Sequence, residues 1–287
     1  MTEDITDPLL NRLNAVTHDH PELGEAARLY GAILPLVRDA DLRVSPPPIT
    51  PDEARARLAR RVPLLPGLDL ELDGDAVRGL MLRLARGVAA SGVAGQSAAA
   101  EAIRTAIAEG KLDPATLVMH AAAGKDSTAE SLAQELGLDA QLLILLARTA
   151  CKPALRAWQR QLAPLMAGIQ WDRGFCFVCG AAATMGELRG NGQARHLRCS
   201  QCGADWRFER LACVRCGNSD HATRHCMYVE GRHEEMRLDA CELCKGYLKV
   251  IAAFDPTPVE MLSVEDLATL HLDYIARAHG YGRGRGP

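Results

Sequence analysis

Apolar residues recur at helical spacing through residues 1–168. Helix-start signals precede such stretches: Thr50-Pro51-Asp52-Glu53 combines a capping hydroxyl, a proline at the first helical position and a carboxylate three residues later. Asp113-Pro114 and Ser127-Thr128-Ala129-Glu130 repeat this pattern. The clearest apolar face is formed by leucines at helical spacing, at Leu132, Leu136, Leu142, Leu143 and Leu146. The pattern predicts a helical bundle or array over residues 1–168.

Two segments interrupt the helical pattern. Three consecutive prolines end the segment 44–48, and each lacks an amide donor and restricts the residue before it, so we expect a loop there. Helical periodicity stops again at 168–174. Farther on, 247–252 fits a strand or a short helix. Ser263-Val264-Glu265-Asp266 is expected to cap a last helix that runs to about Ala278, and the tail 281–287, YGRGRGP, is expected to be disordered.

Composition supports helices and an intracellular location. Aromatic residues make up only 4% of the chain, and unbranched residues, which lose little rotamer freedom in helices, are abundant. The acidic start MTEDITDPLL lacks the features of a secretory signal, and no apolar run has the length of a membrane span. We therefore expect a cytoplasmic protein without stable membrane association.

Eight of the ten cysteines form four CxxC pairs between Cys176 and Cys244. The pairs are Cys176/Cys179, Cys199/Cys202, Cys213/Cys216 and Cys241/Cys244. Two thiolates three residues apart in a tight turn can face one ion, and two such turns complete a tetrahedron. Gaps of 19 and 24 residues inside the first and second halves of this set leave room for a hairpin. Sequential pairing therefore predicts two metal ions, each held by four cysteines.

Glycine follows three of the pairs directly, at Gly180, Gly203 and Gly217, and follows the fourth one place later, at Gly246. A residue without a Cβ atom can adopt positive φ there and turn backbone amides toward the thiolates, as in zinc ribbons and rubredoxin knuckles. This placement of glycines after the CxxC pairs favours metal sites over two alternatives. Disulfides are disfavoured in a reducing compartment, and a thioredoxin-like redox pair needs a βαβ unit that the sequence does not offer.

The remaining cysteines and the nearby histidines are not needed as ligands. We expect Cys151 to pack as a small hydrophobic residue of its helix. We expect Cys226 to be a partly buried thiol, with a spare ligand as the alternative. The histidines of this region are read as surface residues or as residues that surround the ligands, with a mixed site as the alternative: His196, His221, His225 and His233.

Four thiolates close a metal's coordination shell, so neither site has a position for substrate. No catalytic triad, phosphate loop or dinucleotide fingerprint was found elsewhere, and we expect no enzyme activity. The predicted fold class is an α-helical amino-terminal domain, two small rubredoxin-like or zinc-ribbon metal modules and a carboxy-terminal helix. The expected boundaries are 1–168, 169–210, 211–254 and 255–287.

The charge of the cysteine-rich region argues against a nucleic-acid partner. Residues 171–254 contain 12 Lys and Arg against 10 Asp and Glu, a formal +2 with neutral thiols. Each divalent ion bound by four thiolates contributes −2, so the loaded region carries about −2. Nucleic-acid affinity rests on a positive face that neutralises phosphates. Arg195/Arg198 and Arg207/Arg210 are interpreted as solvated surface arginines, and we expect a protein partner.

A distinctive stretch runs from Cys199-Ser200-Gln201-Cys202-Gly203-Ala204-Asp205-Trp206 through Arg210 to Cys213-Val214-Arg215-Cys216-Gly217. It resembles the FdhE family of formate dehydrogenase accessory proteins. The resemblance extends to 176–180, to 241–244 with 247–249, and to 266–270 with Leu272-Asp273. It covers about the last 110 residues well and the helical part only in general plan. Phe177 and His196 depart from the family's usual proline and tyrosine, and neither departure removes a ligand.

The resemblance implies a helical domain with two rubredoxin-like modules, a class of site associated with iron in the family, although spacing alone accepts iron or zinc. It also implies a cytoplasmic maturation factor that binds the catalytic subunit of a molybdenum- or tungsten-dependent formate dehydrogenase. Two alternatives remain open: a rubredoxin-type electron-transfer protein and a nucleic-acid-binding zinc-ribbon protein. Trp206 is expected to pack in the core beside the second cysteine pair.

Overall fold

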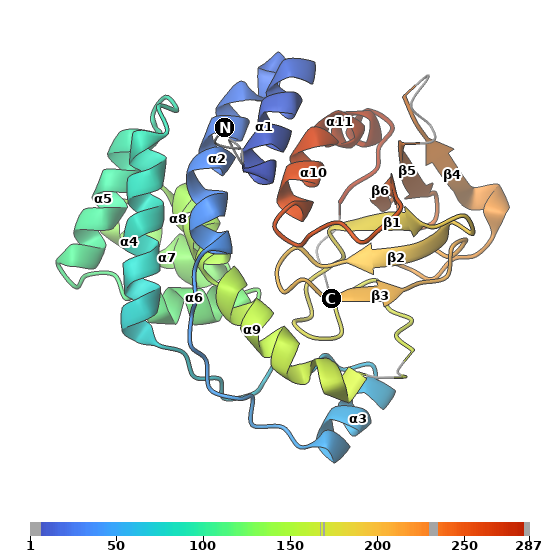
Figure 1. Cartoon of the computed structure of the whole chain (residues 1–287), viewed down its shortest axis with the longest axis horizontal. Coiled ribbons are helices and arrows are strands. Elements are labelled where there is room, and N and C mark those ends of the chain that lie inside the picture. The colour runs from blue at the N-terminus through green and yellow to red at the C-terminus, as the bar shows by residue number, and fades with distance from the viewer. Residues whose placement is uncertain (1–6, 167, 169, 230–234, 284–287) are drawn as a thin grey trace, which may run out of the picture. The chain divides into compact units, whose positions relative to one another are not determined.

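The computed structural model describes residues 7–166, 168, 170–229 and 235–283 of the chain (Figure 1). They fold into two compact units. The helical unit contains residues 7–48 and 67–161, and the sheet unit contains residues 49–66 together with the described residues from Leu162 onward. The division into separate modules at 169–210 and 211–254 stays a prediction. Strands from both of these ranges join one sheet.

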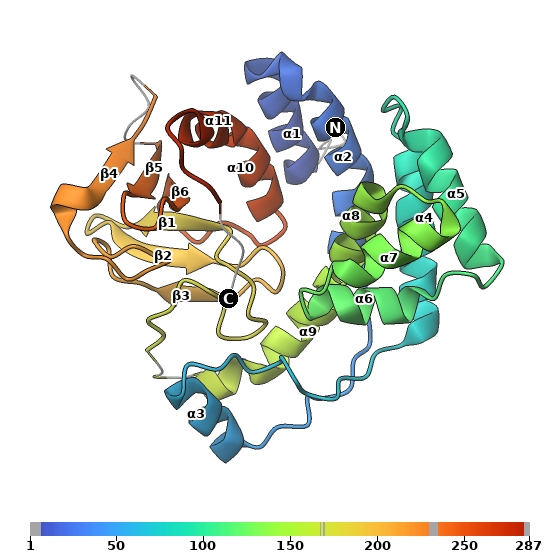
Figure 2. The same cartoon turned by 180° about the vertical axis from the view of Figure 1, so that it is seen from behind.

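Helices form the first unit, as the sequence predicted (Figures 1 and 2). They are α1 (Pro8–Asp19), the 3-10 turn η1 (Pro21–Leu23), α2 (Gly24–Arg38), α4 (Gly74–Ala90), α5 (Gln96–Ala108), α6 (Pro114–Ala122), α7 (Ser127–Leu136), α8 (Ala140–Ala150) and α9 (Lys152–Leu162), whose last residue belongs to the sheet unit. Helix α4 packs against α2, α5, α6 and α8 and buries an apolar face. At Gly87 an added Cβ would lie 2.8 Å from the carbonyl oxygen of Ala32, so glycine permits the close approach of α2 and α4.

Two of the three predicted helix starts have the expected caps. Thr50 and Glu53 form a reciprocal capping box at α3 (Pro51–Ala59), a helix of the sheet unit. Asp113 accepts from the amide of Thr116 at 3.2 Å at the start of α6. The third prediction was wrong: Ser127 is already the first residue of α7, so the capping position falls on Asp126, whose carboxylate instead accepts from Arg148 at 2.8 Å.

A sheet of six described strands organises the second unit. The strands are β1 (Met185–Arg189), β2 (Ala194–Arg198), β3 (Asp205–Arg207), β4 (Arg224–Met227), β5 (Met236–Cys241) and β6 (Tyr247–Ala253). Their order is β3-β2-β1-β6-β5-β4. Each half is an antiparallel meander, and the halves join through the parallel pair β1/β6, in which Gly186 lies opposite Val250. The segment 247–252, ambiguous in sequence, is therefore a strand.

Helices α10 (Leu262–Ala268) and α11 (Leu270–Ala278) cover one face of the sheet and bury Leu262, Leu272 and Ala276 against it. Two 3-10 turns, η2 (Ala163–Met166) and η3 (His221–Thr223), complete the described elements of this unit. The core between the helices and the sheet includes Leu238 and Ala240 of β5.

The expected single last helix is broken at Thr269. The carbonyl of Asp266 accepts from Lys249 Nζ at 2.6 Å, and the Thr269 hydroxyl donates to the carbonyl of Glu265 at 2.7 Å. The Glu265 carbonyl still accepts from the Thr269 amide at 3.1 Å, so the Asp266 carbonyl, taken up by Lys249, is the one that no longer continues the helical ladder. Ser263 is not the capping residue, because α10 already begins at Leu262.

The expectation of a disordered tail was wrong for residues 281–283. Tyr281 is buried, Gly282 forms a bridge with Gly246, and Arg283 is paired with two carboxylates. Glycine and arginine content indicated disorder, but buried acidic partners elsewhere in the unit fix this segment. Residues 284–287 lie outside the described part.

Candidate metal centres

The eight paired cysteines come together in two groups of four, in the predicted sequential arrangement. The first group, called the first centre below, is Cys176, Cys179, Cys199 and Cys202, and the second centre is Cys213, Cys216, Cys241 and Cys244. Within each group all four sulfur atoms lie within 4.8 Å of one another. In each half, one CxxC turn precedes the first strand of the half and the other follows a strand that returns the chain to it.

The sulfur spacing suits one ion at each centre. Four thiolates about 2.3 Å from an ion in a tetrahedron lie about 3.8 Å from one another. The sulfurs of Cys176 and Cys202 are 3.4 Å apart and those of Cys179 and Cys199 are 3.6 Å apart. The corresponding second-centre distances are 3.6 Å for Cys213/Cys244 and 3.7 Å for Cys216/Cys241. All ten cysteines are free thiols.

Backbone hydrogen bonds give the turns a common shape. In the first turn the Cys176 amide donates to the carbonyl of Ala181 at 2.7 Å, and the Gly180 amide donates back to the carbonyl of Cys176 at 2.9 Å. The turns that begin at Cys199 and Cys213 repeat both bonds. Amides also point at sulfur, since Val178 N lies 3.3 Å from Cys176 Sγ. Such donors favour the thiolate form that a metal requires.

Three of the four turns use glycine as predicted, and the fourth does not. Gly180, Gly203 and Gly217 have φ of 78°, 81° and 73°. In the fourth turn Lys245 takes this position, with φ of 51°, and not Gly246. Position 246 requires glycine for a different reason, because an added Cβ would lie 2.0 Å from Cδ of Arg215 in the third turn.

The first centre is enclosed by remote segments of the sheet unit. All four of its cysteines are buried. The chain after α3 bonds to the first turn, with Leu64 N donating to the carbonyl of Phe177 at 2.8 Å and Leu65 N to that of Val178 at 2.9 Å. Trp206 is buried, as predicted, and its ring meets Phe177 edge-on with centroids 5.8 Å apart. The first centre is thus shielded from water.

The second centre is more open. Cys216 is exposed and Cys244 is partly exposed. Leu211 lies two residues before Cys213 and Leu243 lies between Cys241 and Cys244, and their exposed fractions are 64% and 67%. Burial raises the pKa of Cys241, but the amides of Cys244 and Leu243 and the side chain of Asn218 outweigh it and bring the pKa to about 6. These hydrogen bonds favour the thiolate form of Cys241.

The other predicted cysteines and histidines lie outside both groups. Cys151 is buried at the end of α8, as expected. The prediction for Cys226 was wrong, because the thiol is exposed on the edge strand β4. His221 and His225 are exposed, and His196 is partly buried with Nδ1 2.8 Å from Asp205. His233 lies outside the described residues.

The arginines of the sheet unit correct another expectation. Arg195 and Arg198, interpreted as surface residues, are only 1% and 4% exposed. Arg195 pairs with Asp239 at 3.2 Å, and Arg198 bonds to the carboxylate of Glu187. Arg195 and Arg198 are three residues apart on β2, so their side chains lie on opposite faces of the sheet, and each is buried beside an acidic partner that the local sequence does not indicate. Sequence reasoning also missed the buried polar contacts of Lys249 and Asp273, although both residues lie in segments that carried the family resemblance.

A chain with a helical unit and a sheet unit that gathers two sets of four cysteines has the architecture of the rubredoxin-like or zinc-ribbon class, whose cysteine groups could each hold a metal ion. Comparison with known proteins narrows this class. Residues 211–286 match the family model of the FdhE C-terminal domain. The predicted resemblance to the FdhE family is confirmed over this carboxy-terminal domain.

Relatives show the same resemblance in sequence, and a solved structure shows it in fold. A protein FdhE homolog of Stutzerimonas stutzeri is 36% identical over 115 residues, which cover 39% of this chain and 37% of that protein. A homolog from Pseudomonas aeruginosa is 31% identical over 136 residues, 44% of each chain. The matches thus span less than half the length of these relatives. The crystal structure of the FdhE protein from Pseudomonas aeruginosa has the same fold, with a TM-score of 0.64 and 23% identity over 97% of this chain and 93% of that one.

Within the described part of the chain, every helix is too short or too polar to cross a lipid bilayer.

Proposed function

We propose that this chain is a cytoplasmic maturation factor for a molybdenum- or tungsten-dependent formate dehydrogenase, and that it binds the catalytic subunit of that enzyme and supports its assembly. The match of residues 211–286 to the FdhE C-terminal domain carries the proposal. The formate dehydrogenase is the client that the family resemblance implies. The same resemblance supports a role in assembly and not in catalysis.

The eight grouped cysteines are proposed to hold two ions of iron or zinc. Sulfur spacings of 3.4–3.7 Å within the groups support tetrahedral thiolate coordination. An ion held by four thiolates crosslinks two turns and has no position left for substrate. The ions therefore maintain the shape of the sheet unit, and the function is not enzymatic.

A protein is the proposed partner in preference to a nucleic acid. Two of the four arginines that could have formed a phosphate-binding face are buried and paired, at Arg195 and Arg198. The remaining two, Arg207 and Arg210, are exposed. Loaded centres would add negative charge to the same unit, which weakens any attraction for phosphates.

Affinity capture with the formate dehydrogenase catalytic subunit tests the proposal. The subunit is co-expressed with the tagged chain, and with a Cys213→Ser variant that lacks one ligand of the second centre. A Cys226→Ser variant is the matched control, because it also replaces a cysteine of the sheet unit but lies outside both groups. We expect capture by the unaltered chain and the control and reduced capture by Cys213→Ser. Equal recovery by all three, or recovery no greater than from an untagged strain, rejects client binding of this kind.

The exposure of Cys216 supports one second candidate function, electron transfer through iron at the second centre. An ion close to the surface can exchange electrons with a docked partner. The measurement is the visible charge-transfer absorption of iron-loaded protein. Reversible bleaching on reduction would support electron transfer, whereas a colourless zinc form that restores formate dehydrogenase activity in cells would exclude it.

A further inference from the structure

The segment Tyr281–Arg283 runs along the fourth cysteine turn, beside the second centre. The Gly282 amide donates to the carbonyl of Lys245 at 2.8 Å, and Gly282 forms a parallel bridge with Gly246. The Tyr281 hydroxyl donates to the carboxylate of Glu242, and Nζ of Lys245 lies 5.4 Å from the centre of the Tyr281 ring. One short segment thus contacts three residues in and after the turn that carries Cys241 and Cys244.

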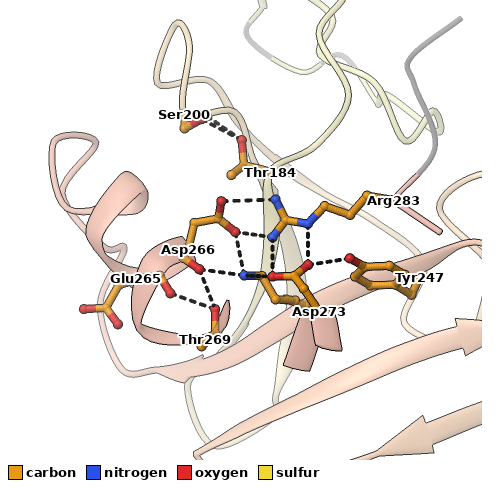
Figure 3. A network of polar contacts seen from close by, with 9 residues as sticks. Thr184, Ser200, Tyr247, Glu265, Asp266, Thr269, Asp273 and Arg283 are labelled. Atoms are coloured by element: carbon orange, nitrogen blue, oxygen red, sulfur yellow. Dashed lines mark hydrogen bonds and ion pairs between the residues drawn. The ribbon is translucent and has the colours of Figure 1, made fainter. Parts of the chain in front are cut away.

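Arg283 anchors this segment to the interior of the sheet unit (Figure 3). Its Nε lies 2.7 Å from Asp273 and its Nη1 lies 3.1 Å from Asp266. Figure 3 shows the guanidinium between these two carboxylates, with the Tyr247 hydroxyl on the far side of Asp273. The Asp273 side chain is only 4% exposed. The Asp266 and Arg283 side chains are 27% and 42% exposed, so the anchor is buried on the side of Asp273 and its guanidinium is partly open to water. The charged hydrogen bond to the buried Asp273 carboxylate is the stronger part of the anchor.

The charges around the anchor are balanced. Lys249, with a fully buried side chain, lies 2.7 Å from both Asp266 and Asp273, so two cations face two carboxylates. Burial alone would lower the pKa of Arg283, but Asp266 and then Asp273 raise it above its usual value. Loss of Arg283 would leave the buried Asp273 carboxylate and the partly exposed Asp266 carboxylate to share Lys249, which is unfavourable for the buried charge. The segment is thus held firmly to α10 and α11.

The fourth turn needs such support more than the other three. Lys245 adopts φ of 51°, a conformation that disfavours residues with a Cβ, whereas glycine occupies this place in the other turns. The contacts of Gly282 and Tyr281 fall on Lys245 itself. The first centre has a comparable support from a different segment, the chain at Leu64 and Leu65.

We propose that Tyr281–Arg283 is a clasp that holds the fourth cysteine turn closed, and that Arg283 is a positioning residue for the second centre. The proposal rests on the metal binding proposed above. It assigns a role to Lys249, Asp266 and Asp273 as well, since the two aspartates bind Arg283 and Lys249 pairs with both of them. The second centre would then lose its ion readily when the clasp opens, and the first centre would not respond.

Metal release tests the clasp. Purified full-length protein loaded with zinc is mixed with excess chromogenic chelator, and the two ions are followed as two kinetic phases. For Arg283→Gln we expect release of one ion per chain to accelerate roughly tenfold, because the charge-assisted contacts of Arg283 with Asp266 and Asp273 are lost. The slower, first-centre phase should not change, and Arg283→Lys should restore part of the retention. Arg277→Gln is the matched control, because it removes the same charge from an exposed position on α11.

Cysteine alkylation mapped by mass spectrometry provides a second readout that does not require bound metal. In Arg283→Gln, Cys241 and Cys244 should be labelled faster, while Cys176 and Cys199 keep their rates. Unchanged labelling and release, or equal acceleration at both centres, overturns the clasp. Protein that carries no metal but still shows selective labelling would instead reject the proposed metal sites and leave the clasp supported.

Discussion

Replacing Lys249 by methionine tests how strongly the buried ion network stabilises the sheet unit. The Lys249 side chain is fully buried, and its Nζ lies 2.7 Å from Asp266, 2.7 Å from Asp273 and 2.6 Å from the carbonyl of Asp266. Methionine has a similar length and fills the space without charge. The variant therefore removes the interactions and leaves the packing largely intact.

The expected loss follows from the groups left behind. Asp266 and Asp273 would share only Arg283, and removal of one partner from a buried ion pair costs about 3–5 kcal/mol. Burial lowers the pKa of Lys249, and the two aspartates offset this only in part, so the wild-type network is itself penalised. We therefore expect a loss at the lower end, about 3 kcal/mol in the free energy of unfolding.

Urea unfolding measures this loss. Tryptophan emission is followed in a Trp158→Phe background, so that Trp171 and Trp206 report on the sheet unit. Arg61→Gln is the control: Arg61 contacts Asp172 at 2.6 and 2.9 Å, but the two side chains are 40% and 57% exposed. Solvent screening should make this pair nearly neutral. A loss below about 1 kcal/mol for Lys249→Met, in the range of exposed pairs, would refute the reasoning.

Three further predictions follow from the centres and the network. Cys199→Ser should lower the metal content by about one ion per chain by elemental analysis while circular dichroism of the helical unit is retained; unchanged stoichiometry would contradict the ligand assignment. Burial raises the pKa of Asp266, but Arg283 and Lys249 outweigh this effect and hold the pKa below its usual 3.8. The ionised Asp266 therefore stabilises the folded protein fully above pH 3.8, and this stabilisation is lost as the pH falls through the lowered pKa of the folded state. Unfolding free energy measured against pH should therefore decline below about pH 4, and Asp266→Asn should flatten that decline. Gly217→Ala should destabilise the protein in urea titrations by about 1 kcal/mol, because φ is 73° and nothing lies within 4 Å of an added Cβ, so backbone strain is the whole effect; a neutral result would exclude strain.

The two groups of four cysteines could be predicted from the sequence because each CxxC pair is a local pattern. A CxxC pair fixes two sulfurs in one turn, and sequential pairing needed only a hairpin between turns. The positive φ of Gly180, Gly203 and Gly217 follows from the same spacing. The positive φ of Lys245 in the fourth turn could not be predicted in this way, because this residue adopts the strained conformation with contacts from residues 281–282, far away in the sequence.

The rest of the sheet unit depends on contacts that no local pattern encodes. The parallel register between β1 and β6 joins segments some sixty residues apart. Charged residues are usually exposed, but Lys249 and Arg195 are buried. Their burial is explained by the carboxylates that pair with them, Asp273 and Asp239. The composition of the tail likewise indicated disorder, because it does not show that Arg283 pairs with Asp266 on α10 and Asp273 on α11.

The parallel junction also limits how the molecule can be dissected. Tyr247–Ala253 lies in the interior of the sheet, and its first five residues are buried. A fragment that starts at residue 211, where the family model begins, would lack β1 and would present one side of β6 as an open, apolar edge. Such edges recruit strands from other molecules. Expression of the carboxy-terminal domain alone should therefore yield self-associating material unless residues from β1 are included.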